Sequence, residues 1–342
     1  MIIQRNSKFA LIGHGYVIYH LYKEFCKNYF IKPIIITHHK KFHKRDIRES
    51  KDNKKIYRNI FELSKDTKIF CVNDINTRKV YNILKENKIT HIFSASSRFI
   101  FKDNIINKYS NKIFNIHGAL LPQERGSGTY TYRIMNGQYF CGATIHIISR
   151  GLDKGKVVLK SKKKLIHKNS LPIDFITETN KIYRQLIKLF LKKILYKKKF
   201  HLLKQDEIKS SYFPRFFTEK MGIINFALKG SEIERFIKGC SKPYFGASCL
   251  VNFKKKHLKM RILNAKFIKS SYVHPFLYGK IIYNHNKKIK ILIQDGYLLI
   301  KFVDIKLNQE KMKKKLLGKT CYNNLDDIRN SYLSRTSVFK YY

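Results

Sequence analysis

Apolar and polar residues alternate in blocks along the first part of the chain, and the block lengths indicate strands separated by helices. Lys8–Ile12 is an apolar run of strand length, and it ends at a glycine turn. Val17, Leu21 and Phe25 follow at a spacing that places them on one face of a helix. Pro33–Thr37 is the next apolar run. The chain is therefore predicted to open with a strand, a helix and a second strand.

The same alternation continues toward residue 116. Strand-length runs are found at Thr67–Val72, Thr90–Ser94 and Lys112–Ile116, with a helical pattern at Asn76–Glu86. Strands that alternate with helices form a parallel sheet, so the sequence predicts an α/β fold with a Rossmann-like, mostly parallel sheet. The Gly13-His14-Gly15 turn lacks the third glycine of a dinucleotide-binding loop, and we interpret it as structural.

The second part of the chain has a different pattern. Ser170–Leu195 is predicted to be a long amphipathic helix, and the polar stretch that includes Gln205–Ser211 has the composition of a linker. We therefore predict a first domain over residues 1–204 and a second over residues 205–342. The second contains four short strand-like runs, at Leu258–Leu263, Gly279–Tyr283, Ile289–Ile293 and Leu298–Phe302. Such runs predict a smaller, β-rich domain of the open-barrel type.

Composition indicates a folded protein with a large positive charge. Of the 342 residues 44% are apolar and 14% aromatic, and the net charge is +48. A charge of this size favours a polyanionic partner such as RNA. However, residues 1–204 carry 43 basic against 13 acidic residues (net +30) and residues 205–342 carry 28 against 10 (net +18). Because the excess is spread evenly, it gives RNA binding only weak support.

Cysteine usage and hydropathy indicate an intracellular protein. The six cysteines form no C-x-x-C pair, which favours free, mostly buried thiols in a reducing compartment. No apolar stretch of signal-peptide length is found in the first 23 residues, and no run approaches the roughly 18 residues of a membrane span. We therefore expect a cytoplasmic protein without membrane insertion.

Chemistry-bearing residues are concentrated between Asn115 and Gly155. Asn115 and His117 lie at the carboxyl end of a predicted strand, where open α/β sheets bind their ligands. Their side chains point to the same face because strands have a period of two. Asp153 follows a later strand, in a turn flanked by glycines, from which a carboxylate could reach the imidazole. Taken singly, the three residues could equally be a turn cap, an interior histidine and a turn residue.

The complete pattern resembles a known family. Asn-x-His-Gly-x-Leu-Leu-Pro-x-x-Arg-Gly is followed by Asn-Gly, by Gly-x-Thr-Ile-His and by Gly-Leu-Asp-x-Gly. This series resembles the formyltransferases that use 10-formyltetrahydrofolate, among them methionyl-tRNA, glycinamide ribonucleotide and amino-sugar N-formyltransferases. The resemblance implies that Asn115, His117 and Asp153 are the catalytic residues, that 10-formyltetrahydrofolate is the co-substrate, and that no metal takes part.

The resemblance also implies binding residues. Arg98, Phe99 and Ile100 would help to form the slot for the folate pterin, and the other expected folate-binding residues are Ile148, Ser149 and Arg150. Arg125, Gly126 and Tyr130 would bind the acceptor. Two stretches depart from the family pattern.

The first departure is a Gly-Ser-Gly-Thr-Tyr sequence from Gly126, which replaces a common proline and bears on the acceptor. The second is a pair of lysines, Lys154 and Lys156, which stand where threonine and aspartate are common. They are expected to favour the ionised form of Asp153.

The basic stretch His38–Arg58 allows two interpretations. It is either a solvated loop or a contact for phosphates of the acceptor. Metal binding is disfavoured because His38, His39 and His43 have no carboxylate or cysteine at ligand spacing.

Three hypotheses for the function follow. Length, the predicted barrel and the charge favour methionyl-tRNA as the acceptor. The Ser96–Phe99 segment, the stretch after Gly126 and the Lys242-Pro243-Tyr244 run resemble enzymes that formylate nucleotide-linked amino sugars. The third hypothesis is a non-catalytic RNA-binding protein on this fold, which retention of the three catalytic residues disfavours. We give tRNA a slight preference.

Overall fold

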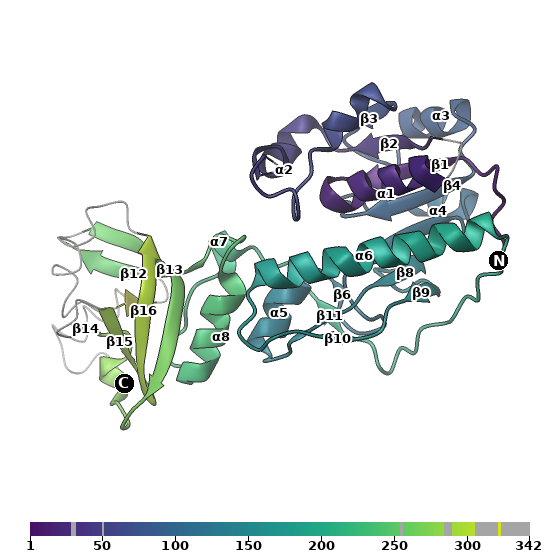
Figure 1. Ribbon diagram of the computed structural model, residues 1–342. Coiled ribbons are helices and arrows are strands. Elements are labelled where there is room, and N and C mark those ends of the chain that lie inside the picture. Colours follow the sequence, from purple (N-terminus) through teal and green to yellow (C-terminus); the bar gives the residue numbers. More distant parts are fainter. Residues whose placement is uncertain (29–31, 50, 254–255, 284–288, 305–320, 323–342) are drawn as a thin grey trace. The chain divides into compact units, whose positions relative to one another are not determined.

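The computed structural model describes residues 1–28, 32–49, 51–253, 256–283, 289–304 and 321–322. They fold into two compact units that alternate along the chain (Figure 1). Residues 1–129, 140–166 and 174–214 form the first unit, and residues 130–139, 167–173 and the described residues from 215 onward form the second. The last crossing between the units lies beyond the predicted boundary at residue 205, because Tyr212–Phe213 forms a strand within the first unit.

A seven-stranded sheet forms the centre of the first unit, in the order β3-β2-β1-β4-β5-β8-β9. The first five strands are parallel, β8 is antiparallel to β5, and β9 is antiparallel to β8. The predicted mostly parallel sheet is therefore confirmed. Its strands are β1 (Phe9–Gly13), β2 (Ile34–Thr37), β3 (Ile69–Cys71), β4 (His91–Ala95), β5 (Ile113–His117), β8 (Thr144–Ile147) and β9 (Val157–Lys160).

Helices cover both faces of this sheet, which explains why β1 and β4 are buried throughout. On one face, α3 (Arg78–Glu86) and α4 (Asp103–Lys108) share a buried cluster with alternate residues of the strands, Ile113 among them. On the other face, α1 (Gly15–Asn28) and α6 (Pro172–Leu195) contribute aromatic rings (Figure 1). Phe190 of α6, for example, packs 5.1 Å from Phe114, centroid to centroid.

Short elements complete the first unit. They are η1 (Lys40–His43), α2 (Lys44–Glu49), η2 (Ile60–Lys65), β6 (Arg125–Gly126), β7 (Phe140–Cys141), β10 (Lys164–Leu165) and β11 (Tyr212–Phe213). Strand β6 pairs in parallel with β11, and β7 pairs antiparallel with β10.

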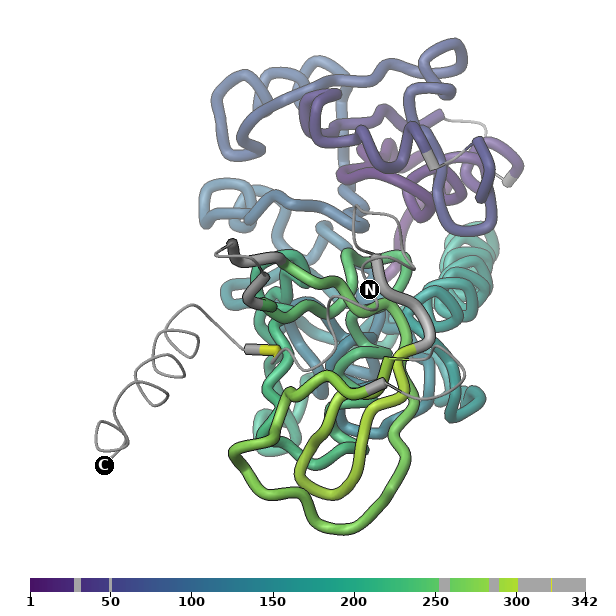
Figure 2. Tube along the Cα trace, turned by 90° about the vertical axis from the view of Figure 1, so that its left-hand side faces the viewer, coloured from purple at the N-terminus to yellow at the C-terminus, as the bar shows by residue number. Residues whose placement is uncertain are grey.

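The second unit is built on a six-stranded antiparallel sheet, which confirms the prediction of a smaller β-rich domain. Its order is β14-β15-β16-β13-β12-β17. The long strand β13 runs beside β16, with a register shift near Asn264 that marks a β-bulge (Figure 1 and Figure 2). The strands are β12 (Ala247–Phe253), β13 (Lys256–Lys269), β14 (Ile281–Tyr283), β15 (Ile289–Ile293), β16 (Gly296–Asp304) and β17 (Cys321–Tyr322).

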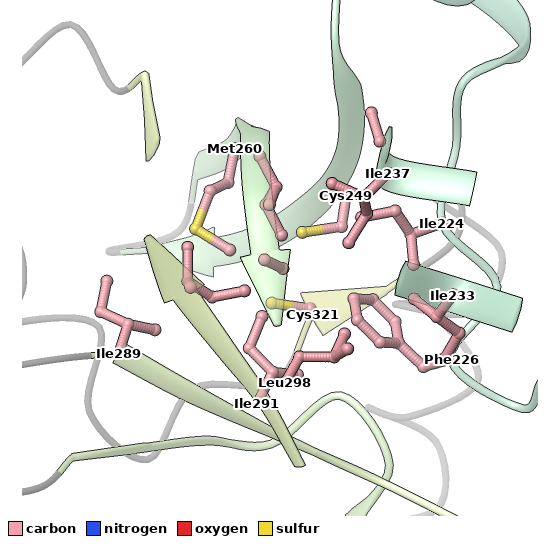
Figure 3. Packing of buried hydrophobic residues seen from close by; sticks show 14 of the residues in the cluster. Ile224, Phe226, Ile233, Ile237, Cys249, Met260, Ile289, Ile291, Leu298 and Cys321 are labelled. Carbon is pink, nitrogen blue, oxygen red and sulfur yellow. The ribbon is translucent and has the colours of Figure 1, made fainter. Parts of the chain in front are cut away.

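The core of this unit forms between the sheet and helix α8 (Gly230–Cys240). Ile233 and Ile237 of the helix meet strand residues such as Cys249, Met260 and Leu298 (Figure 3). The remaining elements of the unit are α5 (Thr129–Met135, entered from the first unit), α7 (Thr218–Met221) and η3 (Pro275–Leu277).

All six cysteines are free thiols and four of them are buried, as the sequence predicted. Among the described residues, no helix combines the length and the apolar character that a membrane crossing requires.

The turn after β1 imposes a strict requirement for glycine. Gly13 has a φ of +139° and lies opposite Ala95 in the sheet. A Cβ atom at this position would lie 1.8 Å from the backbone oxygen of Ala95. This agrees with a structural interpretation of the Gly13-His14-Gly15 turn.

We expect Gly13→Ala to lower the free energy of unfolding by about 2–5 kcal/mol, since it combines unfavourable backbone torsion with a backbone clash. Gly15→Ala is the matched control: φ there is +68°, but the nearest atom to an added Cβ is the Asp46 carboxylate at 3.2 Å. It should lose only about 1–2 kcal/mol. Urea denaturation followed by circular dichroism measures both, and equal losses would contradict the clash.

Candidate active site

Strand β5 brings Asn115 and His117 to the carboxyl edge of the sheet. The residues alternate with Phe114 and Ile116, so both side chains lie on the face that Ile113 shares with α3 and α4. Both residues are partly exposed, whereas Ile113, Phe114 and Ile116 are buried. The first two residues of the predicted trio therefore lie next to each other at this edge of the sheet.

A second histidine lies opposite Asn115 on the antiparallel strand β8. Asn115 pairs with His146 in the register of the two strands, and Asn115 Nδ2 lies 3.1 Å from His146 Nε2. The other ring nitrogen, Nδ1, lies 3.0 Å from the backbone oxygen of Ile147 and donates to it. His146 Nε2 is then free to accept an N–H from the Asn115 amide. Sequence analysis did not select His146 because its position depends on this strand register.

The carboxylate of Asp153 reaches both imidazoles. Asp153 Oδ2 lies 3.7 Å from His117 Nδ1, and Oδ1 lies 3.4 Å from His146 Nε2. The backbone N–H of Gly126 donates to Oδ2 at 2.9 Å. Asp153 itself has a φ of +52°, a left-handed conformation that is uncommon outside glycine. The structure thus brings Asn115, His117 and Asp153 together and adds His146 to them.

Asp153 is held in its ionised form. Burial alone would raise the pKa of this carboxyl, but its contacts with His146 and His117 and the hydrogen bond from the Gly126 N–H together lower the pKa to about 2. The sequence predicted an ionised Asp153 on account of Lys154 and Lys156. Instead, Lys154 Nζ lies 3.6 Å from the carboxylate of Glu207, so the imidazoles and the backbone amide are responsible.

His117 is held in its neutral form. Burial lowers the pKa of its imidazole, and this effect exceeds the opposite effects of the Asp153 charge and the Glu124 carbonyl. His117 Nε2 lies 2.8 Å from the backbone oxygen of Glu124 and donates its proton there. Nδ1 is then the unprotonated nitrogen, and it faces Asp153. A proton taken up at Nδ1 would complete an ion pair with Asp153.

Two of the residues predicted to bind folate pack against the same apolar cluster beside the sheet. Phe99 and Ile148 both lie against the apolar cluster of α3 and α4, and the Phe99 ring stacks on His38 with 3.8 Å between the ring centroids. Ile100 is 77% exposed. The backbone N–H of Arg98 donates to His38 Nε2 at 3.0 Å.

The other predicted binding residues have contacts of their own or belong to the second unit. The guanidinium of Arg150 pairs with Asp103 at 2.8 Å, and Ser149 Oγ lies 3.5 Å from the backbone oxygen of Arg150. Tyr130 belongs to the second unit. The roles of all these residues stay predictions.

One group of side chains has the composition of a metal site. Ligand atoms of His14, His43 and Asp46 lie within 4.8 Å of one another, so a carboxylate does approach the histidine-rich loop in space. However, Asp46 Oδ2 pairs with His14 Nδ1 at 3.0 Å, and Arg45 Nε lies 3.8 Å from Oδ1. His43 Nε2 is engaged by the backbone oxygen of His38. We interpret the group as a hydrogen-bonded contact that joins the turn before α1 to α2.

Comparison with known proteins identifies the family. The model of the formyl transferase family matches residues 14–173, and that of the formyl transferase C-terminal domain matches residues 217–321. Together they cover well over half of the chain. The chain belongs to the formyltransferase family.

Curated relatives of this formyltransferase include methionyl-tRNA formyltransferases. The protein of Finegoldia magna is 25% identical over 229 residues, 66% of this chain and 70% of the relative. That of Flavobacterium johnsoniae is 28% identical over 194 residues, 54% of this chain and 57% of the relative.

Solved structures confirm the fold. WlaRD, a sugar 3N-formyltransferase crystallised with dTDP and 5-N-formyltetrahydrofolate, superposes with a TM-score of 0.60 at 22% identity, over 88% of this chain and 99% of WlaRD. The N-formyltransferase of Helicobacter canadensis, in complex with folinic acid and dTDP-3-aminofucose, gives 0.59 at 20% identity, over 87% and 100%.

The side chain of Arg125 in this formyltransferase is bound by other side chains of the protein. Its guanidinium is 5% exposed and forms hydrogen bonds with the Glu207 carboxylate (2.8 and 2.9 Å) and with Gln205 Oε1 (2.9 and 3.2 Å). Gly126 contributes its N–H to Asp153. The predicted contact of Arg125 and Gly126 with the acceptor stays a prediction, but the structure gives both a part in forming the site.

We expect Arg125→Met to lower the free energy of unfolding by at least about 1.5 kcal/mol, the lower value for one hydrogen bond to a charged group. Arg78→Met, at an exposed position of α3, is the control and should have little effect. Thermal and urea denaturation provide the measurement. Unchanged stability together with a raised KM for the acceptor would instead assign Arg125 to acceptor binding.

Proposed function

We propose that this formyltransferase transfers the formyl group of 10-formyltetrahydrofolate to a primary amine, with Asn115, His117 and Asp153 as catalytic residues. The supporting observation is the ionised Asp153 carboxylate, which lies between two imidazoles and beside the Asn115 amide at the carboxyl edge of the sheet. The folate ligands crystallised with the sugar N-formyltransferases above support the identity of the donor.

The reaction requires a neutral amine and stabilisation of a developing negative charge. The amine nitrogen forms a bond with the formyl carbon, the carbonyl oxygen becomes an oxyanion, and the bond from that carbon to N10 of the folate then breaks. One proton leaves the amine and one is gained by N10. No covalent bond to the protein is needed, so the protein has to position the reactants, supply hydrogen-bond donors and transfer a proton.

Asn115 is suited to bind the oxyanion. A carboxamide has two N–H donors, and His146 Nε2 accepts only one of them. The second N–H is available to the oxyanion. Because His146 Nδ1 donates to a backbone carbonyl, the tautomer of His146 is fixed, and with it the orientation of the Asn115 amide.

His117 and Asp153 are suited to move the proton. Neutral His117 accepts the proton of the attacking amine, and the imidazolium that forms faces Asp153 at Nδ1 and the Glu124 carbonyl at Nε2. Both N–H groups of the charged ring then have acceptors. The same proton is later returned to N10 of the departing folate. Since no step needs a metal ion, we retain the prediction that none takes part.

We expect Asn115→Ala and His117→Ala each to fold normally and to lower kcat by about two to three orders of magnitude, near 3 kcal/mol in the barrier. The assay supplies 10-formyltetrahydrofolate and an amine acceptor and follows tetrahydrofolate release, with circular dichroism as the check on folding. Substantial activity in both variants would exclude this mechanism. A wild-type protein that binds RNA without turnover on any acceptor would favour the non-catalytic alternative.

A basic cavity favours a polyanionic acceptor, and we propose methionyl-tRNA, the initiator of translation. The cavity has a volume of about 560 Å³ and lies along η1 and α2 in the loop that follows β2. Its lining is Lys40, Lys41, Lys44, Ile47, Arg48 and Lys51. Five positive charges around one cavity would bind successive phosphates of an RNA backbone. The names of the curated relatives agree with this acceptor.

The second candidate acceptor is a nucleotide-linked amino sugar. Its support is the superposition on sugar N-formyltransferases along nearly their whole length. The phosphates of a single nucleotide would engage far fewer of the cavity lysines than an RNA. The two acceptors therefore differ in how strongly binding depends on salt.

Replacing Lys41 and Lys44 by glutamine tests the acceptor. With tRNA, we expect a raised KM and a slope of log affinity against log salt that falls by about 2, one for each lost phosphate contact. Lys79→Gln with Lys85→Gln, at exposed positions of α3, removes the same charge elsewhere and should change little. Formylation of an amino sugar alone, unaffected by the Lys41 and Lys44 changes, would favour the second candidate.

A further inference from the structure

A segment from a distant part of the sequence passes along the active site. We call residues 205–213 the strap. It follows Leu203, which is bound to Val157 of β9 by two backbone hydrogen bonds of 2.8 and 3.0 Å, and it ends in β11. The sequence suggests a polar linker here, but the strap belongs to the first unit and is hydrogen-bonded to it at Gln205, Glu207 and Ser211.

The end of the strap holds the turn that contacts His117. Ser211 Oγ accepts the N–H of Glu124 at 2.9 Å, and the Ser211 carbonyl accepts the N–H of Arg125 at 2.9 Å. A Cβ atom on Gly126 would lie 2.3 Å from the backbone oxygen of Phe213, so the strap fits closely against this turn. This turn presents the Glu124 carbonyl to His117 and the Gly126 N–H to Asp153.

The start of the strap holds the turn that carries Asp153. Gln205 is 6% exposed, and its Nε2 donates to the backbone oxygens of Asp153 and Gly155, both at 2.7 Å. Its Oε1 accepts two N–H groups from Arg125. All four hydrogen-bonding positions of the amide are filled, and reversing the amide would place oxygen against two carbonyls. The orientation of Gln205 is therefore fixed.

We propose that Gln205 is a positioning residue that sets the location of the Asp153 carboxylate relative to His117. Its amide joins the Asp153 turn to Arg125. Arg125 lies in sequence between Glu124, whose carbonyl contacts His117, and Gly126, whose N–H contacts Asp153. Gln205 touches neither reactant in the proposed reaction. Gln205 affects turnover by maintaining the 3.7 Å distance between Asp153 Oδ2 and His117 Nδ1. This inference rests on the proposed function.

Two substitutions distinguish the donor group of the Gln205 amide from its acceptor group. Gln205→Ala removes all four hydrogen bonds. Gln205→Glu keeps the acceptors for Arg125 but loses both donors to the Asp153 turn. Lys204→Gln, at an exposed neighbouring position, is the control. If the donors position Asp153, both Gln205 variants should lose about 100-fold in kcat, as for an active-site displacement near 1 Å, with a nearly unchanged KM for folate.

The pH profile provides a measurement that a purely structural role would not change. The groups that face His117 are Asp153, Glu124 and His146, and the Asp153 carboxylate raises the pKa of the His117 imidazole. If the carboxylate moves away in Gln205→Ala, the acid limb of the kcat profile should shift to lower pH. A Gln205→Glu variant with wild-type kcat, or an Ala variant with an unshifted limb, would overturn the proposal.

The wild-type protein distinguishes this inference from the proposed function. No formyl transfer by the wild type means that the proposed function is wrong. An active wild type with full activity in both Gln205 variants contradicts only the role of Gln205.

Discussion

The buried carboxylate of Asp153 is the group on which the geometry of the active site depends. An ionised carboxylate loses several kcal/mol of hydration when it is buried, and it persists only where other groups replace that hydration. Here three separate stretches of the chain surround it: the N–H of Gly126 donates to Oδ2, and the rings of His146 on β8 and His117 on β5 lie 3.4 and 3.7 Å away, where a proton taken up by either ring would pair the charge. Displacing any of these stretches would leave the charge partly unpaired, so the carboxylate couples their positions.

This coupling also sets the protonation states that the proposed mechanism needs. The contacts that lower the pKa of Asp153 keep it ionised at neutral pH, while burial keeps His117 neutral. One group is thus ready to stabilise a cation and the other to take up a proton. Neighbouring ionisable groups whose pKa values are shifted by burial and by each other are typical of acid–base sites. A neutral His117 with an unprotonated Nδ1 is more useful for deprotonating an amine than a permanent ion pair would be.

The sequence predicted those features that follow from local periodicity. It did not predict the features that depend on contacts between segments distant in the sequence. The common face of Asn115 and His117 follows from the period of a strand, and the parallel sheet follows from the alternation of strands and helices. His146 ends the Gly-x-Thr-Ile-His motif, but the motif alone does not reveal its place opposite Asn115, which depends on strand register. The strap residue Gln205 was assigned to a linker because its polar composition does not reveal that its amide is buried.

The departures from the family pattern replace none of the proposed catalytic residues, and this bears on how acceptors are selected. Lys154 replaces a common threonine, and its ammonium lies near Glu207 of the strap rather than beside the Asp153 carboxylate. The altered sequence that begins at Gly126 continues to Tyr130, where the chain leaves the first unit for the second. Asn115, His117, His146 and Asp153 all belong to the first unit. The transfer chemistry can therefore stay constant while the segments that lead into the second unit change with the acceptor. Such a separation explains how one fold serves both RNA-linked and sugar-linked amines, and why the acceptor is better sought in the segments around the reacting groups.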